Sequence, residues 1–166
     1  MRIALCILQG TINLSPMKTI IAALDFSDSS ALVLDAAIAQ AKLQQAKLLL
    51  VHVIEPLPSY TAYGMTPDEY PMIQQFQDNS QKYAETQLRS AAGLAGTLVS
   101  EVHSLCTVGM ALPTLCEQVE EHQASLIVLG THGHGVLGSL LLGSVAEGMV
   151  RRALCPTLII PCKKND

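Results

Sequence analysis

The chain has 166 residues, of which 49% are hydrophobic and only 14% are charged, and its formal net charge is −4. This composition is typical of one compact domain with a sizeable core and excludes a disordered chain. The acidic balance without a basic stripe argues against a nucleic-acid partner, and no apolar run reaches the roughly 20 residues that span a bilayer.

We expect two parts: an N-terminal extension at residues 1–17 and a folded domain at residues 18–166. The extension contains an apolar stretch, Ile3–Leu8, that is shorter than the apolar core of a signal peptide and is followed by no Ala-x-Ala site. Met17 looks like a more natural start. We interpret the preceding residues either as an upstream start or as an accessory arm.

From Lys18 onward, apolar segments of strand length alternate with segments of helical periodicity. In chain order we expect a strand at Thr19–Leu24, a helix with its N-cap among residues 27–30 that reaches about Leu43, a strand at Leu48–Ile54, a helix at about Met72–Ala92, a strand at Leu98–Cys106, a helix at about Ala111–His122, a strand at Leu126–Leu129, a helix at Ser144–Ala153 and a strand at Thr157–Ile160. This alternation predicts an α/β fold, a doubly wound parallel sheet with helices on both faces. Ligands of such sheets bind beyond the carboxyl ends of the strands, where the strand order reverses.

A glycine-rich loop follows the fourth expected strand, with the spacing Gly130-x2-Gly133-x9-Gly143-Ser144. Glycines let the backbone approach a phosphate closely, and the helix that follows offers free N–H groups and the positive end of its dipole. This loop is not a Walker loop, because Gly138-x4-Gly143 is followed by Ser144 where a lysine is required. Without that lysine, the case for fast γ-phosphoryl transfer is weak.

With this spacing the chain resembles the ATP-binding branch of the universal stress proteins, whose fingerprint is Gly-x2-Gly-x9-Gly-Ser/Thr. The resemblance extends from about Lys18 to Pro161 and implies a five-stranded sheet of order 3-2-1-4-5. It also implies ATP as the ligand, with Mg²⁺ bridging the phosphates. The loop would then supply the binding residues Gly130, Gly133, Gly143, Ser144 and Val145.

Three residues outside the loop complete the candidate site. Asp25 ends the first expected strand, where a carboxylate can accept hydrogen bonds from ribose hydroxyls. In the similar family an aspartate at this Asp-Phe-Ser position contacts the nucleotide, whereas the alternative is a turn residue that caps the next helix. By the same resemblance, the backbone of Val53 reads the adenine edge and Ala23 lines the pocket, although Val53 on its own looks like a core residue.

Ser144 has a second possible role, because Ser-Val-Ala-Glu is the pattern of a capping box in which Glu147 reaches back to the cap N–H. Capping and phosphate binding by Ser144 are compatible. His132 and His134 are spaced poorly for a tetrahedral metal site, and no second Cys/His pair lies nearby in sequence. We interpret both as solvated loop residues, assign no catalytic residue and leave the metal ligands open.

The favoured function is therefore ATP binding, as a sensor or regulatory module in a stress response. One alternative is a slow ATPase, which needs a water-positioning base that the sequence does not identify. The other is a stress-response dimer that binds no nucleotide and acts through protein contacts, although the intact glycine fingerprint argues against it. The resemblance implies a homodimer through the fifth strand, Thr157–Ile160, whose edge position invites pairing. Five cysteines without a C-x-x-C pair favour the cytoplasm.

Overall fold

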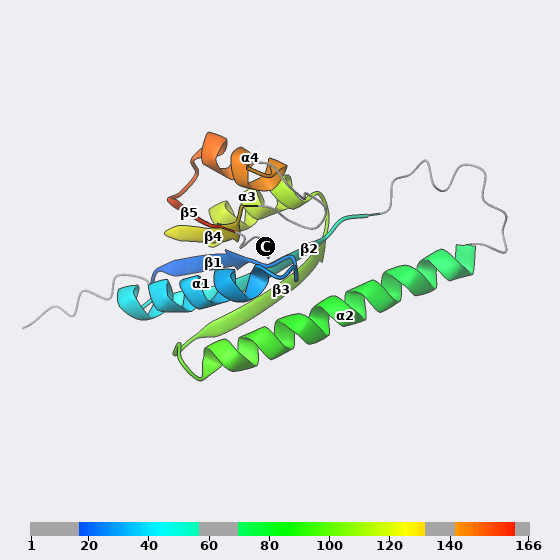
Figure 1. The fold of residues 1–166 in the computed structure, drawn as a ribbon, viewed down its shortest axis with the longest axis horizontal. Coiled ribbons are helices and arrows are strands. Elements are labelled where there is room, and N and C mark those ends of the chain that lie inside the picture. Colours follow the sequence, from blue (N-terminus) through cyan, green and yellow to red (C-terminus); the bar gives the residue numbers. More distant parts are fainter. Residues whose placement is uncertain (1–16, 57–69, 132–141, 162–166) are drawn as a thin grey trace, which may run out of the picture.

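The computed structural model describes residues 17–56, 70–131 and 142–161, in which strands and helices alternate throughout (Figure 1). The elements are β1 (Thr19–Ala23), α1 (Ser30–Gln44), β2 (Lys47–Ile54), α2 (Tyr70–Gly96), β3 (Val102–Val108), α3 (Ala111–Glu121), β4 (Leu126–Gly130), α4 (Ser144–Arg152) and β5 (Thr157–Ile160). Every expected strand and helix is present in the expected order.

The strands form one parallel sheet of order β3-β2-β1-β4-β5, which confirms the order 3-2-1-4-5. The register places Ile21 of β1 opposite Leu49 of β2 and Ile127 of β4. The chain runs outward from β1 to β3 on one side and from β4 to β5 on the other. The strand order therefore reverses between β1 and β4, and a ligand site is expected at their carboxyl ends.

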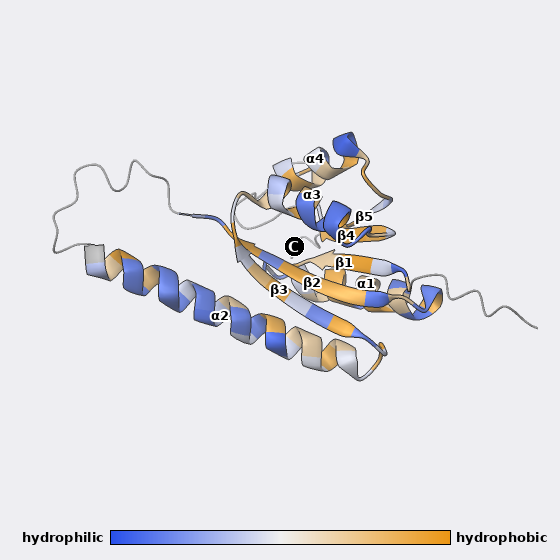
Figure 2. Ribbon diagram, turned by 180° about the vertical axis from the view of Figure 1, so that it is seen from behind, coloured by the Kyte–Doolittle hydropathy of each residue, from blue (hydrophilic) through white to orange (hydrophobic). Residues whose placement is uncertain are grey.

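Both faces of the sheet are covered, because side chains alternate between two cores. Ile20 and Ala22 of β1 point to a core that α1 and α2 complete with Val33, Leu88 and other apolar residues. Ile21 points to the opposite core, which α3 and α4 complete. All three of these β1 side chains are fully buried. Such burial on both faces explains why the central strands are apolar without polar alternation, as their orange colour in Figure 2 shows.

Helix α2 is unevenly packed. Its C-terminal half lies along β2 and β3 and buries Ala84, Leu88 and Ala95. Its N-terminal half projects past the end of the sheet (Figure 1), and there Met72 and Phe76 are largely exposed. This projecting half is mostly hydrophilic, as its blue colour in Figure 2 shows.

The expected start of the third strand at Leu98 is wrong, because α2 continues to Gly96 and β3 begins only at Val102. The Val99 N–H donates to the Ala95 carbonyl oxygen at 2.9 Å, and the Val99 side chain is buried in the core beside α1 and α2. The apolar character of this segment therefore serves the turn that closes α2 rather than a strand.

None of the helices in the described residues combines the length and apolarity that a membrane span requires. Cys106, Cys116 and Cys155 are free thiols. Cys116 is buried, whereas Cys106 and Cys155 are only partly buried. Burial raises the pKa of the Cys106 and Cys155 thiols, so both favour the protonated form, which is a poor nucleophile.

Candidate functional site

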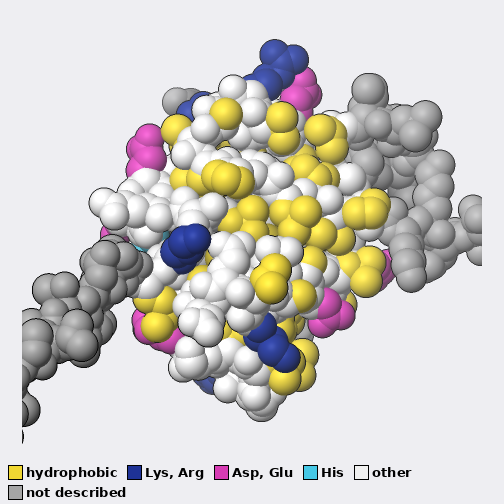
Figure 3. Space-filling model, turned by 90° about the vertical axis from the view of Figure 1, so that its left-hand side faces the viewer, with side chains coloured by type: hydrophobic (Ala, Val, Ile, Leu, Met, Phe, Trp, Pro, Cys, Tyr) yellow, Lys and Arg dark blue, Asp and Glu magenta, His cyan; other side chains and the backbone are white. Residues whose placement is uncertain are grey.

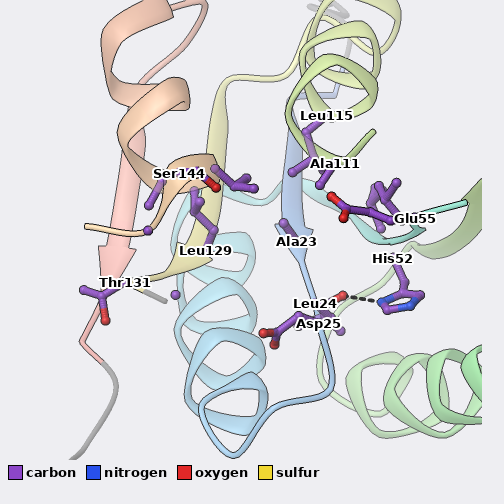
Figure 4. Close-up of a pocket in the computed structure, with 16 residues that line it drawn as sticks. Ala23, Leu24, Asp25, His52, Glu55, Ala111, Leu115, Leu129, Thr131 and Ser144 are labelled. Carbon is purple, nitrogen blue, oxygen red and sulfur yellow. Dashed lines mark hydrogen bonds between the residues drawn. The ribbon is translucent and has the colours of Figure 1, made fainter. Parts of the chain in front are cut away.

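A cavity of about 400 Å³ opens at the carboxyl ends of β1, β2 and β4, where the strand order reverses (Figure 4). Its α4 side consists of Gly130, Thr131 and Gly143–Ala146. Its β1–β2 side consists of Ala23–Asp25 and Val51–Val53. Glu55 and two residues of α3, Ala111 and Leu115, complete the lining. The volume falls in the usual range for small-ligand sites.

The structure brings together the predicted binding residues that it describes. The residues of this set that line the cavity are Ala23, Asp25, Val53, Gly130, Gly143, Ser144 and Val145. The remaining predicted residue, Gly133, lies outside the described residues, as do His132 and His134. Residues that are far apart in the sequence thus share one cavity.

Backbone hydrogen bonds fix the α4 side. The Gly143 N–H donates to the Thr131 carbonyl oxygen at 2.8 Å, and the Thr131 N–H donates to the Ile160 carbonyl oxygen at 2.9 Å. The residue that follows β4 is therefore hydrogen-bonded both to the residue that precedes α4 and to the last residue of β5. This arrangement brings Gly130 and Gly143 to one wall of the cavity.

The first turn of α4 lies at the cavity. The Glu147 N–H donates to the Gly143 carbonyl oxygen at 2.9 Å, which is the first hydrogen bond of the helix. The N–H groups of Ser144, Val145 and Ala146 precede that bond and have no acceptor within the helix. These three residues all line the cavity, so the positive end of the α4 dipole faces it.

The predicted capping box at Ser144 is wrong. Helix α4 begins at Ser144 with Gly143 as its cap residue, and no side-chain hydrogen bond caps it. The Glu147 carboxylate instead accepts a hydrogen bond from Arg151 Nε at 2.9 Å, one turn along the helix. The Glu147 carboxylate is therefore engaged in an i,i+4 ion pair and does not reach back to the start of the helix. Ser144 is exposed and lines the cavity.

Asp25 organises the turn between β1 and α1. Its Oδ1 accepts hydrogen bonds from the Ser27 N–H at 3.1 Å, the Ser27 hydroxyl at 2.7 Å and the Ser30 hydroxyl at 2.8 Å. Helix α1 begins at Ser30, and its cap residue Ser29, one of the four expected candidates, makes no side-chain capping bond. Asp25 thus fixes the turn before α1 without being the cap residue, while its carboxylate lines the cavity.

Two titratable lining residues were missed by the sequence reasoning. His52 of β2 donates from Nδ1 to the Leu24 carbonyl oxygen at 2.7 Å (Figure 4), and its ring lies 4.4 Å from that of Phe26. Glu55 follows β2 directly and is exposed at the cavity. The signal that selected Asp25, a polar residue at the carboxyl end of a central strand, could have found Glu55, whereas His52 lies within β2.

The charge of the cavity is unusual for a phosphate site. Its described lining holds the carboxylates of Asp25 and Glu55 and the imidazole of His52, but no lysine or arginine. The sequence from Gly130 to Ser144 contains neither of these residue types. An anion bound here must therefore be held by backbone N–H groups, hydroxyls, the α4 dipole or a metal ion.

Comparison with known proteins identifies the family. A profile described as the Universal stress protein family matches residues 16–161. The chain belongs to this family. A universal stress protein of Thermus aquaticus is 33% identical over 143 residues, which cover 86% of this chain and 98% of the relative.

Solved universal stress proteins share the fold. One from Lactobacillus plantarum superposes with a TM-score of 0.76 at 22% identity, over 88% of this chain and 99% of its own. Another universal stress protein, solved in complex with cAMP, superposes with a TM-score of 0.60 at 27% identity, over 89% of this chain and 98% of its own. The fold expected from the sequence is therefore that of the universal stress proteins.

Proposed function

We propose that this universal stress protein binds ATP with Mg²⁺ at the carboxyl-end cavity and acts as a sensor or regulatory module. The observation that carries the proposal is the α4 side of the cavity, where the N–H groups of Ser144–Ala146 precede the first helical hydrogen bond and face the same space as Asp25. Backbone N–H groups at a helix N-terminus form an effective phosphate site.

The order of the strands suggests how the nucleotide would be oriented in the cavity. Phosphates would lie at the α4 side, the sugar at Asp25 of β1, and the base near Val53 of β2, in the order in which these strands adjoin. The cAMP complex of a relative that is 27% identical supports an adenine base. Mass analysis of nucleotide released from purified, heat-denatured protein tests this assignment, and release of a non-adenine nucleotide alone would contradict it.

Mg²⁺ is part of the proposal because the cavity lacks a fixed cation among its described lining residues, while Asp25 and Glu55 add negative charge. A bound metal ion would offset the charge of the triphosphate. We expect removal of Mg²⁺ by EDTA to weaken ATP binding at least about tenfold, or about 1.4 kcal/mol, in calorimetry. AMP, with less charge, is the control and should lose much less. Equal losses for both nucleotides would contradict the metal.

A binding module differs from an ATPase in its turnover. With no Walker lysine at Ser144, we expect hydrolysis far below the roughly 1–10³ s⁻¹ typical of enzymes. A phosphate-release assay at saturating ATP and Mg²⁺ measures it. Several turnovers per second would favour the ATPase alternative over the sensor.

We also propose a homodimer through β5. This strand is at the edge of the sheet and is only partly buried, and Val150 of α4 and Leu154 in the connection to β5 are exposed. Figure 3 views the side on which α4 ends and β5 begins, and hydrophobic side chains gather across this face. Pairing with a second copy would satisfy the edge and cover these side chains.

Ile160→Lys tests the dimer, because it places a charge on the proposed interface. We expect the variant to sediment as a smaller species than the wild type at micromolar concentrations. Thermal unfolding of the variant monitors folding. A monomeric wild type would refute the dimer.

The remaining assignments concern boundaries and compartment. We propose residues 18–166 as the nucleotide-binding domain and residues 1–17 as an extension. The free thiols of Cys106, Cys116 and Cys155 fit the reducing cytoplasm that we propose for the protein.

A further inference from the structure

Two hydrogen bonds join Leu24, which follows β1, to β2, and His52 makes the second of them. The Leu24 N–H donates to the Val51 carbonyl oxygen at 2.9 Å, which continues the sheet one residue past β1. The Leu24 carbonyl oxygen then accepts the His52 Nδ1–H at 2.7 Å. Because a carbonyl only accepts, this contact assigns the proton of a neutral His52 to Nδ1.

The Leu24 carbonyl belongs to the peptide group that precedes Asp25. A peptide group is planar, so holding its oxygen also sets the direction in which the chain enters Asp25. Leu24 is buried. If the His52 donor were lost, this buried carbonyl would have no hydrogen-bond partner, and the peptide group would gain free energy by rotating toward another donor.

His52 also supports the residue that follows Asp25. Phe26 has a left-handed backbone with φ of 59°, a conformation that a bulky side chain rarely adopts. Its ring packs 4.4 Å from the His52 ring and lies edge-on to Tyr83 of α2 at 6.4 Å. The neighbours of Asp25 on both sides thus contact one imidazole.

We propose that His52 is a positioning residue for Asp25, holding its carboxylate in the orientation that binds the nucleotide sugar. This inference rests on the proposed function. Ser27 and Ser30 hold the carboxylate itself, whereas His52 holds the backbone from which it projects. The role requires a donor at the Nδ1 position and no contact between His52 and the ligand.

Substitutions at His52 separate the Nδ1 donor from the rest of the ring. In His52→Asn the side-chain amide can occupy the Nδ1 position and donate to Leu24, whereas His52→Gln moves the donor outward and His52→Leu removes it. We expect His52→Asn to bind ATP within about twofold of the wild type, and the other two to lose about fivefold, in calorimetry with Mg²⁺. Equal affinities for all four proteins, or equal losses for all three variants, would overturn the role. Should His52→Leu fail to fold, the comparison of His52→Asn with His52→Gln decides.

A double-mutant cycle tests whether His52 acts through Asp25. In an Asp25→Ala background, we expect His52→Gln to change the ATP affinity by less than about twofold, because coupled changes are not additive. A full additional loss would mean that His52 acts on the ligand independently, and would overturn the positioning role.

Nitrogen NMR of the imidazole provides a readout that does not depend on the nucleotide. Neutral His52 in the wild type is expected as the Nδ1–H tautomer, and the Nε2–H tautomer would overturn the inference. If the wild type binds no ATP at all, the proposed function fails and this inference with it. If it binds and His52→Gln binds equally well, only the inference fails.

Discussion

The two sides of the cavity are built in different ways. On the α4 side, backbone atoms do the positioning, through the bond from Gly143 to Thr131 and the free first turn of the helix. On the β1–β2 side, side chains do it, since Asp25 is held by serines and His52 holds the Leu24 carbonyl. A backbone site tolerates changes of side chain unless they add bulk, whereas a side-chain site fails when one polar atom is removed.

The strongest test of this contrast adds bulk on the α4 side. Gly143→Val would place branched carbons where the proposed phosphates approach the backbone. We expect ATP affinity to fall at least about thirtyfold, or about 2 kcal/mol, in calorimetric titration. Gly93→Ala is a matched control, because a Cβ at Gly93 meets no atom within 4 Å. Unchanged affinity of Gly143→Val would remove the phosphate site from this wall.

On the β1–β2 side, the informative change is the loss of a carboxylate. Asp25→Ala is expected to weaken ATP binding about tenfold, or about 1.4 kcal/mol, because the sugar hydroxyls lose their acceptor. Asp35→Ala, on the exposed side of α1, is the control. If Asp25→Ala instead lowers the melting temperature and leaves the affinity intact, Asp25 serves only the turn before α1.

A smaller effect is expected where α4 rests on α3. A Cβ at Gly148 would overlap with Leu112 Cδ2, so Gly148→Ala forces that side chain to move. We expect the free energy of unfolding to fall by about 1 kcal/mol, measured in urea. Gly93→Ala should instead raise it, by up to about 1 kcal/mol, through helix propensity. A higher free energy of unfolding in both variants would show that α3 does not limit the approach of α4.

Much of the fold was predictable because its signals are local. Apolar segments and helical periodicity gave each element, and the family resemblance gave the strand order, which the sheet confirms. The start of β3 was not predictable, because the apolar side chain of Val99 packs into the core at the turn that follows α2 and is not part of a strand. Glu147 illustrates the same limit, since its choice between the helix cap and Arg151 depends on geometry.

The site divides in the same way. The glycine spacing and the strand-end position of Asp25 selected residues that the structure places around one cavity. His52 was overlooked because it lies within an apolar strand, where pattern reasoning expects core residues. Its partner, a backbone carbonyl 28 positions earlier, leaves no trace in the residue types of the sequence.

Amide hydrogen exchange along α2 is expected to divide the helix near Tyr83. The residues before it bury little, with Met72 71% and Phe76 63% exposed, whereas Leu88 is 2% and Ala95 0% exposed after it. Isolated helical turns are marginal in water, so the projecting half should open locally and exchange fast while the packed half follows global unfolding. Limited proteolysis should accordingly cut before Tyr83 and yield two fragments, one with β1 and β2 and one with β3, β4 and β5, which stay associated through the sheet.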